Sequence, residues 1–213
     1  MPSPTPSALD ELAAGLRARA ARRAGTGVVA IDGWSGSGKT SLADRLAPAL
    51  GAPCVHLDDF VPGWDGLARS VDLLVQWVLE PLAAGRPARL GIWDWTGGEW
   101  GAWRTLPPAE LVLVEGCGSG AAAARPWLAA LAWLDVDAAS RRRRLEARPD
   151  WPGYAPFADR WSAQEEALRA GDDPAALADA VIRWPAGDRE AFDDFAVSWR
   201  PVTPTRSCRA AST

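Results

Sequence analysis

The chain of 213 residues is short of several features, and each shortage excludes a class of protein. It has no run of about eighteen apolar residues, which argues against a membrane-spanning helix. Its net charge is −4, so there is no electrostatic case for binding nucleic acid or an anionic membrane. The three cysteines, Cys54, Cys117 and Cys208, are widely spaced and match no zinc pattern, which favours a reduced, cytoplasmic setting. Residues 1–25 lack the apolar centre of a secretory signal.

Lysine and histidine are the scarcest charged residues. Lysine and arginine together number 23, and only one of them, Lys39, is a lysine. A bias toward arginine acts on the whole chain, so the position that keeps a lysine is informative. The only histidine, His56, lies in a predicted strand. It is interpreted as a packed strand residue rather than a catalyst.

Apolar runs alternate with segments of helical periodicity along the chain. The predicted strands are 28–32, 53–57, 88–95, 109–116, 128–137 and 178–184. The predicted helices are 8–24, 39–50, 70–85, 138–148 and 157–171, with a loop at 150–156. This alternation predicts a doubly wound α/β domain with a central, mostly parallel sheet of about five strands flanked by helices. We expect that domain at 8–199, between a disordered N-terminus at 1–7 and a flexible tail at 200–213.

A phosphate-binding motif follows the first predicted strand. Gly33, Gly38, Lys39 and Thr40 satisfy G-x-x-x-x-G-K-[ST], with an apolar strand before the motif and a helix after it. Glycines let backbone N–H groups turn toward a phosphate, and a thin ammonium group can thread into such a loop where a guanidinium cannot. The motif predicts binding of a nucleoside triphosphate through Gly33, Ser35, Gly36, Ser37, Gly38, Lys39, Thr40 and Ser41. The Thr40 hydroxyl is a predicted ligand of Mg²⁺.

Acidic residues stand at the ends of two predicted strands. Asp58 and Asp59 follow one strand, and Glu115 ends another. Ligands of open α/β sheets bind beyond the carboxyl ends of the strands, where a carboxylate can hold Mg²⁺ or take a proton from a hydroxyl. Strand-end acids also serve as turn formers and helix caps. We interpret Asp58 as functional, and Asp59 and Glu115 as candidate metal residues beside Thr40.

The segments "VAIDGWSGSGKTSLADRLA", "VHLDDFVPGWDGL" and "LVLVEG" resemble the uridine kinase-like group of P-loop small-molecule kinases. The resemblance covers roughly residues 25–185. It implies that Asp58 is the base acting on the acceptor hydroxyl and that Glu115 organises the metal. It also implies that Asp94, in "GIWDW", contacts the acceptor.

An arginine run, "SRRRRLEARPD", follows the predicted strand at 128–137. Four consecutive arginines point in different directions on a helix, so they cannot all face one ligand. The resemblance implies that this segment, about 138–156, is a lid whose arginines close over the transferring phosphoryl group. Arg144 and Arg148 are the predicted catalytic arginines, with Arg141 behind them. A solvated helix face is the alternative, above all for Arg142 and Arg143.

Tryptophans are unusually frequent, and four of the 13 lie at 93–103. They either fill the edge of the sheet or line an acceptor pocket, in which Asp94 and Trp95 are predicted substrate contacts. Trp161 and Glu165, one turn apart after the lid, are interpreted as packing residues.

The resulting expectation is a phosphotransferase that uses ATP and Mg²⁺ to phosphorylate a hydroxyl of a small molecule, nucleoside-like or sugar-like. Its expected partners are that small-molecule acceptor, with no nucleic acid and no membrane, and the chain is expected as a monomer or homodimer. Two alternatives stay open. A nucleoside monophosphate kinase would hold a second phosphate with additional arginines, for which the candidates are Arg69, Arg86, Arg89 and Arg104. An ATP-binding regulatory or assembly protein would need no acceptor pocket.

Overall fold

The computed structural model describes residues 7–184 and 195–201. The segments predicted to lack order, 1–7 and 200–213, lie almost wholly outside these ranges. No helix within the described ranges is long and apolar enough to cross a membrane.

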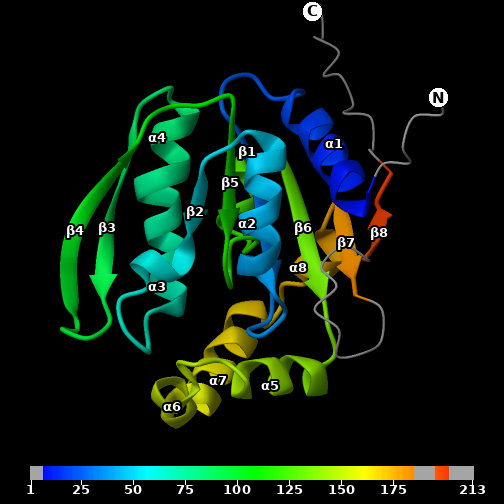
Figure 1. Ribbon diagram of the computed structural model, residues 1–213. Helices are drawn as coiled ribbons and strands as arrows, with labels where there is room; N and C mark the ends of the chain where they lie inside the picture. The colour runs from blue at the N-terminus through cyan, green and yellow to red at the C-terminus, as the bar shows by residue number, and fades with distance from the viewer. Residues whose placement is uncertain (1–6, 185–194, 202–213) are drawn as a thin grey trace, which may run out of the picture.

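The core is a six-stranded sheet in the order β2-β5-β1-β6-β7-β8 (Figure 1). The strands are β1 (Gly27–Gly33), β2 (Cys54–His56), β5 (Leu111–Glu115), β6 (Ala130–Asp135), β7 (Ala180–Arg183) and β8 (Ala196–Trp199). The first five are parallel, as predicted, and β8 is antiparallel to β7. Strand β8 was not predicted, because a strand of only four residues is too short for a periodic pattern to be recognised.

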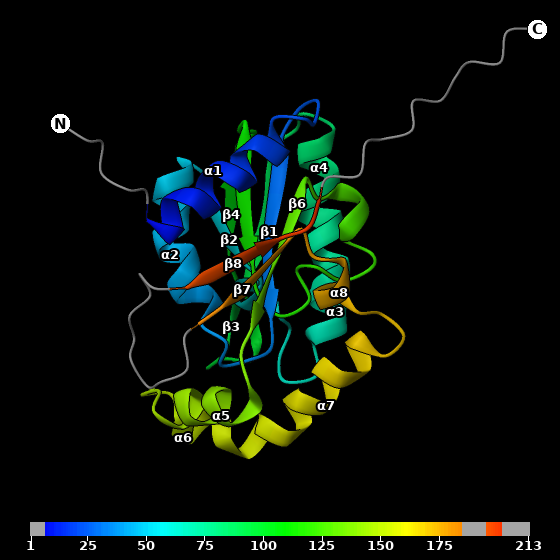
Figure 2. The ribbon, with the colours of Figure 1, turned by 90° about the vertical axis from the view of Figure 1, so that its right-hand side faces the viewer.

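Helices cover both faces of the sheet (Figure 2). Helices α1 (Ala8–Ala20) and α2 (Lys39–Leu50) pack on one face, where Leu12, Leu16 and Leu46 are fully buried. Helices α3 (Leu67–Leu73), α4 (Glu80–Ala83) and α8 (Pro174–Leu177) cover the other. The central strand β1 is therefore buried along its whole length. Ser7 caps α1 through a reciprocal pair of hydrogen bonds with Asp10.

The helix predicted at 70–85 is longer and less regular than expected. It runs from α3 through a π-helical turn, Leu74–Leu79, into α4, so its bounds are 67–83. The π turn adds a residue to the helical repeat and places Trp77 against the rings of Trp100 and Trp103.

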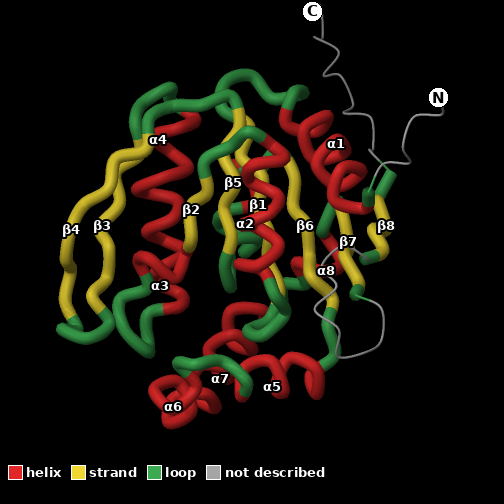
Figure 3. The backbone as a smooth tube through the Cα atoms, in the orientation of Figure 1, coloured by secondary structure: helices red, strands yellow, loops and turns green. Residues whose placement is uncertain are grey.

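A separate antiparallel hairpin lies at the β2 edge, beside α3 and α4 (Figure 3). It pairs β3 (Ala88–Asp94), which was predicted, with β4 (Glu99–Leu106), which was not. Almost every residue of β4 is exposed, so its sequence carries no alternation of buried and exposed positions from which a strand is inferred.

The segment predicted to be a lid crosses the carboxyl ends of the strands. It consists of α5 (Ala138–Glu146) and α6 (Trp151–Tyr154), and it leads through a 3₁₀ turn (Ala155–Phe157) into α7 (Ala158–Arg169). Asp137 caps α5 by accepting a hydrogen bond from the Ser140 N–H at 2.9 Å. The loop predicted at 150–156 is instead largely helical. A proline at the second helical position of α6 led to the prediction of a loop, although proline is compatible with the first turn of a helix.

Candidate active site

The phosphate loop connects the end of β1 to the start of α2. Gly36 and Gly38 have φ angles of +77° and +94°, which side chains rarely adopt. A Cβ on Gly36 would lie 2.4 Å from the carbonyl oxygen of Arg141 in the lid. The two glycines are therefore required by the turn and by the close approach of α5. Ser41 follows in the exposed first turn of α2.

Lys39 lies inside this loop with 8% of its surface exposed. Its Nζ donates to the carbonyl oxygens of Gly33 at 3.0 Å and Trp34 at 3.1 Å, and to Sγ of Cys117 at 3.2 Å. Burial alone would lower the pKa of Lys39, but the surrounding acidic groups, Cys117 and Glu165 among them, raise it above its ordinary value. The side chain is therefore a permanent ammonium group, held at the place where the motif requires one.

Glu115 ends β5 and reaches the phosphate loop from the neighbouring strand. Its carboxylate is 2% exposed, and Oε1 accepts a hydrogen bond from Thr40 Oγ1 at 3.2 Å. The same oxygen lies 2.7 Å from Nδ1 of His56. Hydrogen bonds to Cys54 and Glu115 raise the pKa of His56 to about 10. His56 is a strand residue, as predicted, but its role in supporting Glu115 was not foreseen.

The oxygen donors of Thr40 and Glu115 suit Mg²⁺, which takes few protein ligands and completes its shell with phosphates and water. No group of three or more histidine, cysteine or acidic side chains in the described ranges could hold a metal by itself. Asp59 points elsewhere and forms an ion pair with Arg104 of β4 at 3.2 Å. Its proposed metal role remains a prediction without a contact to Thr40.

Asp58 follows β2 in the 3₁₀ turn Leu57–Phe60. The side chain is exposed to solvent and lies near Lys39, Glu115 and Arg148. Desolvation and the nearby negative charge of Glu115 raise the pKa of Asp58, against the opposing effects of Lys39 and Arg148. A carboxylate in this setting binds a proton more readily than usual, as a general base requires.

The two predicted acceptor contacts in the hairpin have different surroundings. Asp94 accepts the backbone N–H groups of Thr96 and Gly97 at 2.8 and 3.0 Å, and these bonds lower its pKa. In the structure Asp94 thus forms the hairpin turn. Trp95 donates from Nε1 to the Asp58 carbonyl at 3.3 Å and packs against Trp64, with ring centroids 5.0 Å apart. Trp95 therefore lies beside the proposed base, and Asp94 supports the turn that carries it.

The lid arginines separate into two groups. Arg144 donates to the Ser37 carbonyl at 3.1 Å, and Arg141 lies over the Trp34 ring at 5.2 Å, so both reach the phosphate loop. Arg148 forms a bidentate pair with Asp150 and is close enough to influence the pKa of Asp58. Arg142 turns away and pairs with Glu146.

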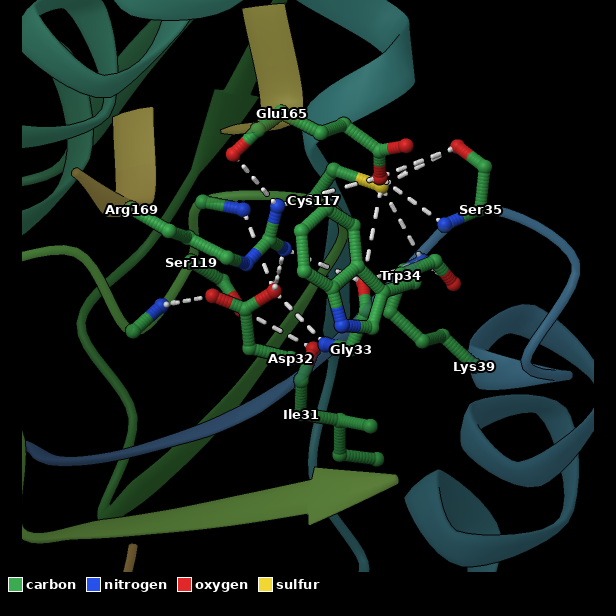
Figure 4. Close-up of polar contacts among 12 residues, drawn as sticks. Ile31, Asp32, Gly33, Trp34, Ser35, Lys39, Cys117, Ser119, Glu165 and Arg169 are labelled. Carbon is green, nitrogen blue, oxygen red and sulfur yellow. Dashed lines mark hydrogen bonds and ion pairs between the residues drawn. The ribbon is translucent and has the colours of Figure 1, made fainter. Parts of the chain in front are cut away.

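Four residues of the site were missed from the sequence: Asp32, Cys117, Glu165 and Arg169. Figure 4 shows them around the phosphate loop. Asp32 is 1% exposed and accepts the N–H groups of Gly118 and Gly120 at 3.1 and 2.9 Å. The glycine-rich segment 116–120 after β5 was the available signal, because glycines spaced in this way bind an anion, here the protein's own carboxylate. Glu165 was interpreted as packing, which is wrong, because it hydrogen-bonds Ser35.

Two solved structures with the same architecture are described as a possible and a putative kinase. A structure described as a possible uridine kinase from Bacillus stearothermophilus superposes with a TM-score of 0.61 at 22% identity, covering 81% of this chain and 96% of that one. The chain has the uridine kinase-like P-loop kinase fold. A structure described as a putative fructose transport system kinase from Silicibacter sp. TM1040 superposes with a TM-score of 0.57 at 22% identity, covering 84% of this chain and all of that one.

The sequence itself matches no known family description and no curated protein. Among these comparisons, only the structural ones show the likeness to the uridine kinase-like fold.

Proposed function

We propose that this protein transfers the γ-phosphoryl group of ATP to a hydroxyl group of a small molecule. The observation that carries the proposal is the setting of Asp58. An exposed carboxylate of raised pKa lies in the turn after β2, within the electrostatic reach of Lys39, Glu115 and Arg148. A base beside a phosphate loop is the arrangement that phosphoryl transfer to a hydroxyl needs.

Each residue has a defined task in this reaction. Lys39 neutralises charge on the β- and γ-phosphates, and the loop amides and Arg144 surround them. Thr40 and Glu115 would hold Mg²⁺, which would offset the negative charge of the phosphates. Asp58 orients the acceptor hydroxyl and takes its proton. The lid excludes water, so that the acceptor is phosphorylated in preference to hydrolysis of ATP.

The arginines that a monophosphate kinase would use are dispersed. Arg69 pairs with Asp72, Arg104 pairs with Asp59, and Arg89 lies over the Trp103 ring. These three guanidinium groups already have different partners within the chain, which favours an uncharged hydroxyl acceptor over a nucleoside monophosphate.

The test is ATP turnover with and without a panel of nucleosides and sugars. Uridine and fructose come first because the similar structures are described as kinases of these kinds. We expect one compound to stimulate ADP release, and Asp58→Asn to lower that stimulated rate by about 10²–10⁴-fold. The exposed Asp72→Asn is the control. Slow hydrolysis that no acceptor stimulates would instead support an ATP-binding regulatory protein.

A further inference from the structure

Helix α7 directs three side chains at the phosphate loop from a distant part of the chain. Trp161, Glu165 and Arg169 are spaced four residues apart, so they lie along one face of the helix. All three are at least nine-tenths buried, although one carries a negative charge and one a positive charge. Buried charges of this kind require specific partners. Here the partners belong to β1 and the phosphate loop, and the two charges also face each other, with Arg169 Nη1 3.9 Å from Glu165 Oε1.

Glu165 binds one residue of the loop. Its Oε1 accepts the backbone N–H of Ser35 at 2.8 Å and the Ser35 hydroxyl at 3.2 Å. The indole Nε1 of Trp161 donates to the same hydroxyl at 3.0 Å. Ser35 is thus fixed through its backbone and its side chain, as Figure 4 shows for Glu165.

Arg169 binds the start of the loop. Its Nη2 forms an ion pair with Asp32 Oδ1 at 3.3 Å and donates to the Gly33 carbonyl at 3.4 Å. Its guanidinium also lies over the ring of Trp34, 4.2 Å from the centroid. Three consecutive residues at the entrance to the loop therefore contact a single arginine.

The loop needs such support, because glycines at positions 33, 36 and 38 leave its backbone free to adopt many conformations. A binding site that is already ordered loses less conformational entropy when the ligand arrives. We propose that Glu165 and Arg169 are positioning residues that hold the phosphate loop in its binding-competent shape before the nucleotide binds. The proposal rests on the proposed triphosphate binding at this loop.

The same helix also holds the acceptor side. Gln164 hydrogen-bonds the Trp64 carbonyl and accepts the Leu67 N–H at 3.3 Å. Trp64 in turn packs against Trp95, which donates to the Asp58 backbone. One helix therefore orders the phosphate loop and the wall beside the proposed base.

Two substitutions separate geometry from charge. Glu165→Gln keeps an acceptor oxygen within reach of Ser35 and removes the charge, whereas Glu165→Asp keeps the charge and withdraws it by one methylene group. We expect Glu165→Asp to weaken MgATP binding by about tenfold or more in calorimetry, and Glu165→Gln to stay within about threefold of the wild type. The exposed neighbour Glu166, changed to Asp and Gln, is the matched control.

Hydrogen exchange of the unliganded protein supplies a readout besides nucleotide binding. Peptides covering residues 31–38 should exchange faster in Glu165→Asp than in the wild type or in Glu165→Gln, with unchanged exchange in the strands β5 and β6. Wild-type affinity and unchanged loop exchange in Glu165→Asp would overturn the proposal, as would a larger loss in Glu165→Gln. If the wild type itself binds no MgATP, the proposed function fails, and the exchange measurement still decides whether α7 holds the loop.

Discussion

The hydroxyl of Thr40 donates to Oε1 of Glu115 at 3.2 Å, which joins the first turn of α2 to the end of β5. The imidazole of His56 lies 2.7 Å from the same oxygen. Thr40 of α2 and His56 of β2 thus both contact one carboxylate oxygen of Glu115 in β5. The histidine lies between Cys54 and Glu115, and its positive charge offsets the negative charge of Glu115.

This contact predicts a dependence of stability on pH. Hydrogen bonds to Cys54 and Glu115 raise the pKa of His56 from its ordinary 6.5 to about 10 in the folded protein. A raised pKa means that the histidine stabilises the fold fully below about pH 6.5, and that this stabilisation is lost as the pH rises through about 10. We expect His56→Asn to lower Tm near neutral pH by at least about 2 °C, with the difference from the wild type disappearing by about pH 10.

Thermal melts of both proteins across this pH range measure the effect. His56 is the only histidine in the chain, so no other imidazole contributes to the difference. A difference in Tm that does not change with pH would contradict the prediction.

Asp58 has the opposite dependence. Desolvation and Glu115 raise its pKa, so its contribution to stability is greatest when it is protonated and is lost as the pH rises through that raised value. We expect Asp58→Asn to raise Tm at neutral pH, a gain that vanishes in acid, while it lowers acceptor-stimulated turnover by about 10²–10⁴-fold. Wild-type turnover should also fall in acid as Asp58 is protonated. A neutral-pH Tm equal to that of the control Asp72→Asn would contradict this prediction.

Replacement of Lys39 by arginine should abolish function despite the retained charge. The ammonium group has two carbonyl oxygens and a thiol within 3.2 Å and little open space around it. A planar guanidinium is too wide for that site. We expect Lys39→Arg to weaken MgATP binding by about tenfold or more in calorimetry, with the fold verified by circular dichroism. Binding close to that of the wild type would show that the loop tolerates a wider cation.

Gly36 tests the contact between the phosphate loop and the lid. Gly36→Ala would add strain from the left-handed backbone and a clash with the Arg141 carbonyl. Gly51→Ala is the matched control, since Gly51 has a φ of +59° and nothing within 4 Å of an added Cβ. We expect both variants to lose about 1 kcal/mol to backbone strain, and only Gly36→Ala to lose further stability and MgATP affinity. Equal losses of stability in denaturant titrations would argue against close packing of the lid on the loop.

The parts of the site that were predictable from the sequence are those encoded in short segments. The phosphate loop needs a strand, glycines at fixed spacing and a helix, all within residues 28–50, so Lys39 and Thr40 were recognised directly. The strand-end positions of Asp58 and Glu115 follow from apolar runs of a few residues. The alternation of strands and helices was sufficient for the parallel sheet.

The remaining parts depend on contacts between distant segments. Glu165 meets Ser35 across 130 residues, and Arg169 meets Asp32 across 137. Nothing in the sequence near α7 distinguishes a glutamate that binds the loop from one that faces solvent, such as Glu166. The exposed strand β4 lacks a buried face, so it also has no periodic signal.

The single lysine has a practical consequence. Reagents and enzymes that acylate lysine side chains find only one ε-amine in this chain, and it lies at the phosphate loop. The extent of acylation, measured by mass spectrometry beyond the N-terminal amine, therefore reports on how accessible this amine is and on how readily it gives up its proton. A labelling time course with and without nucleotide would give site occupancy without any engineered probe.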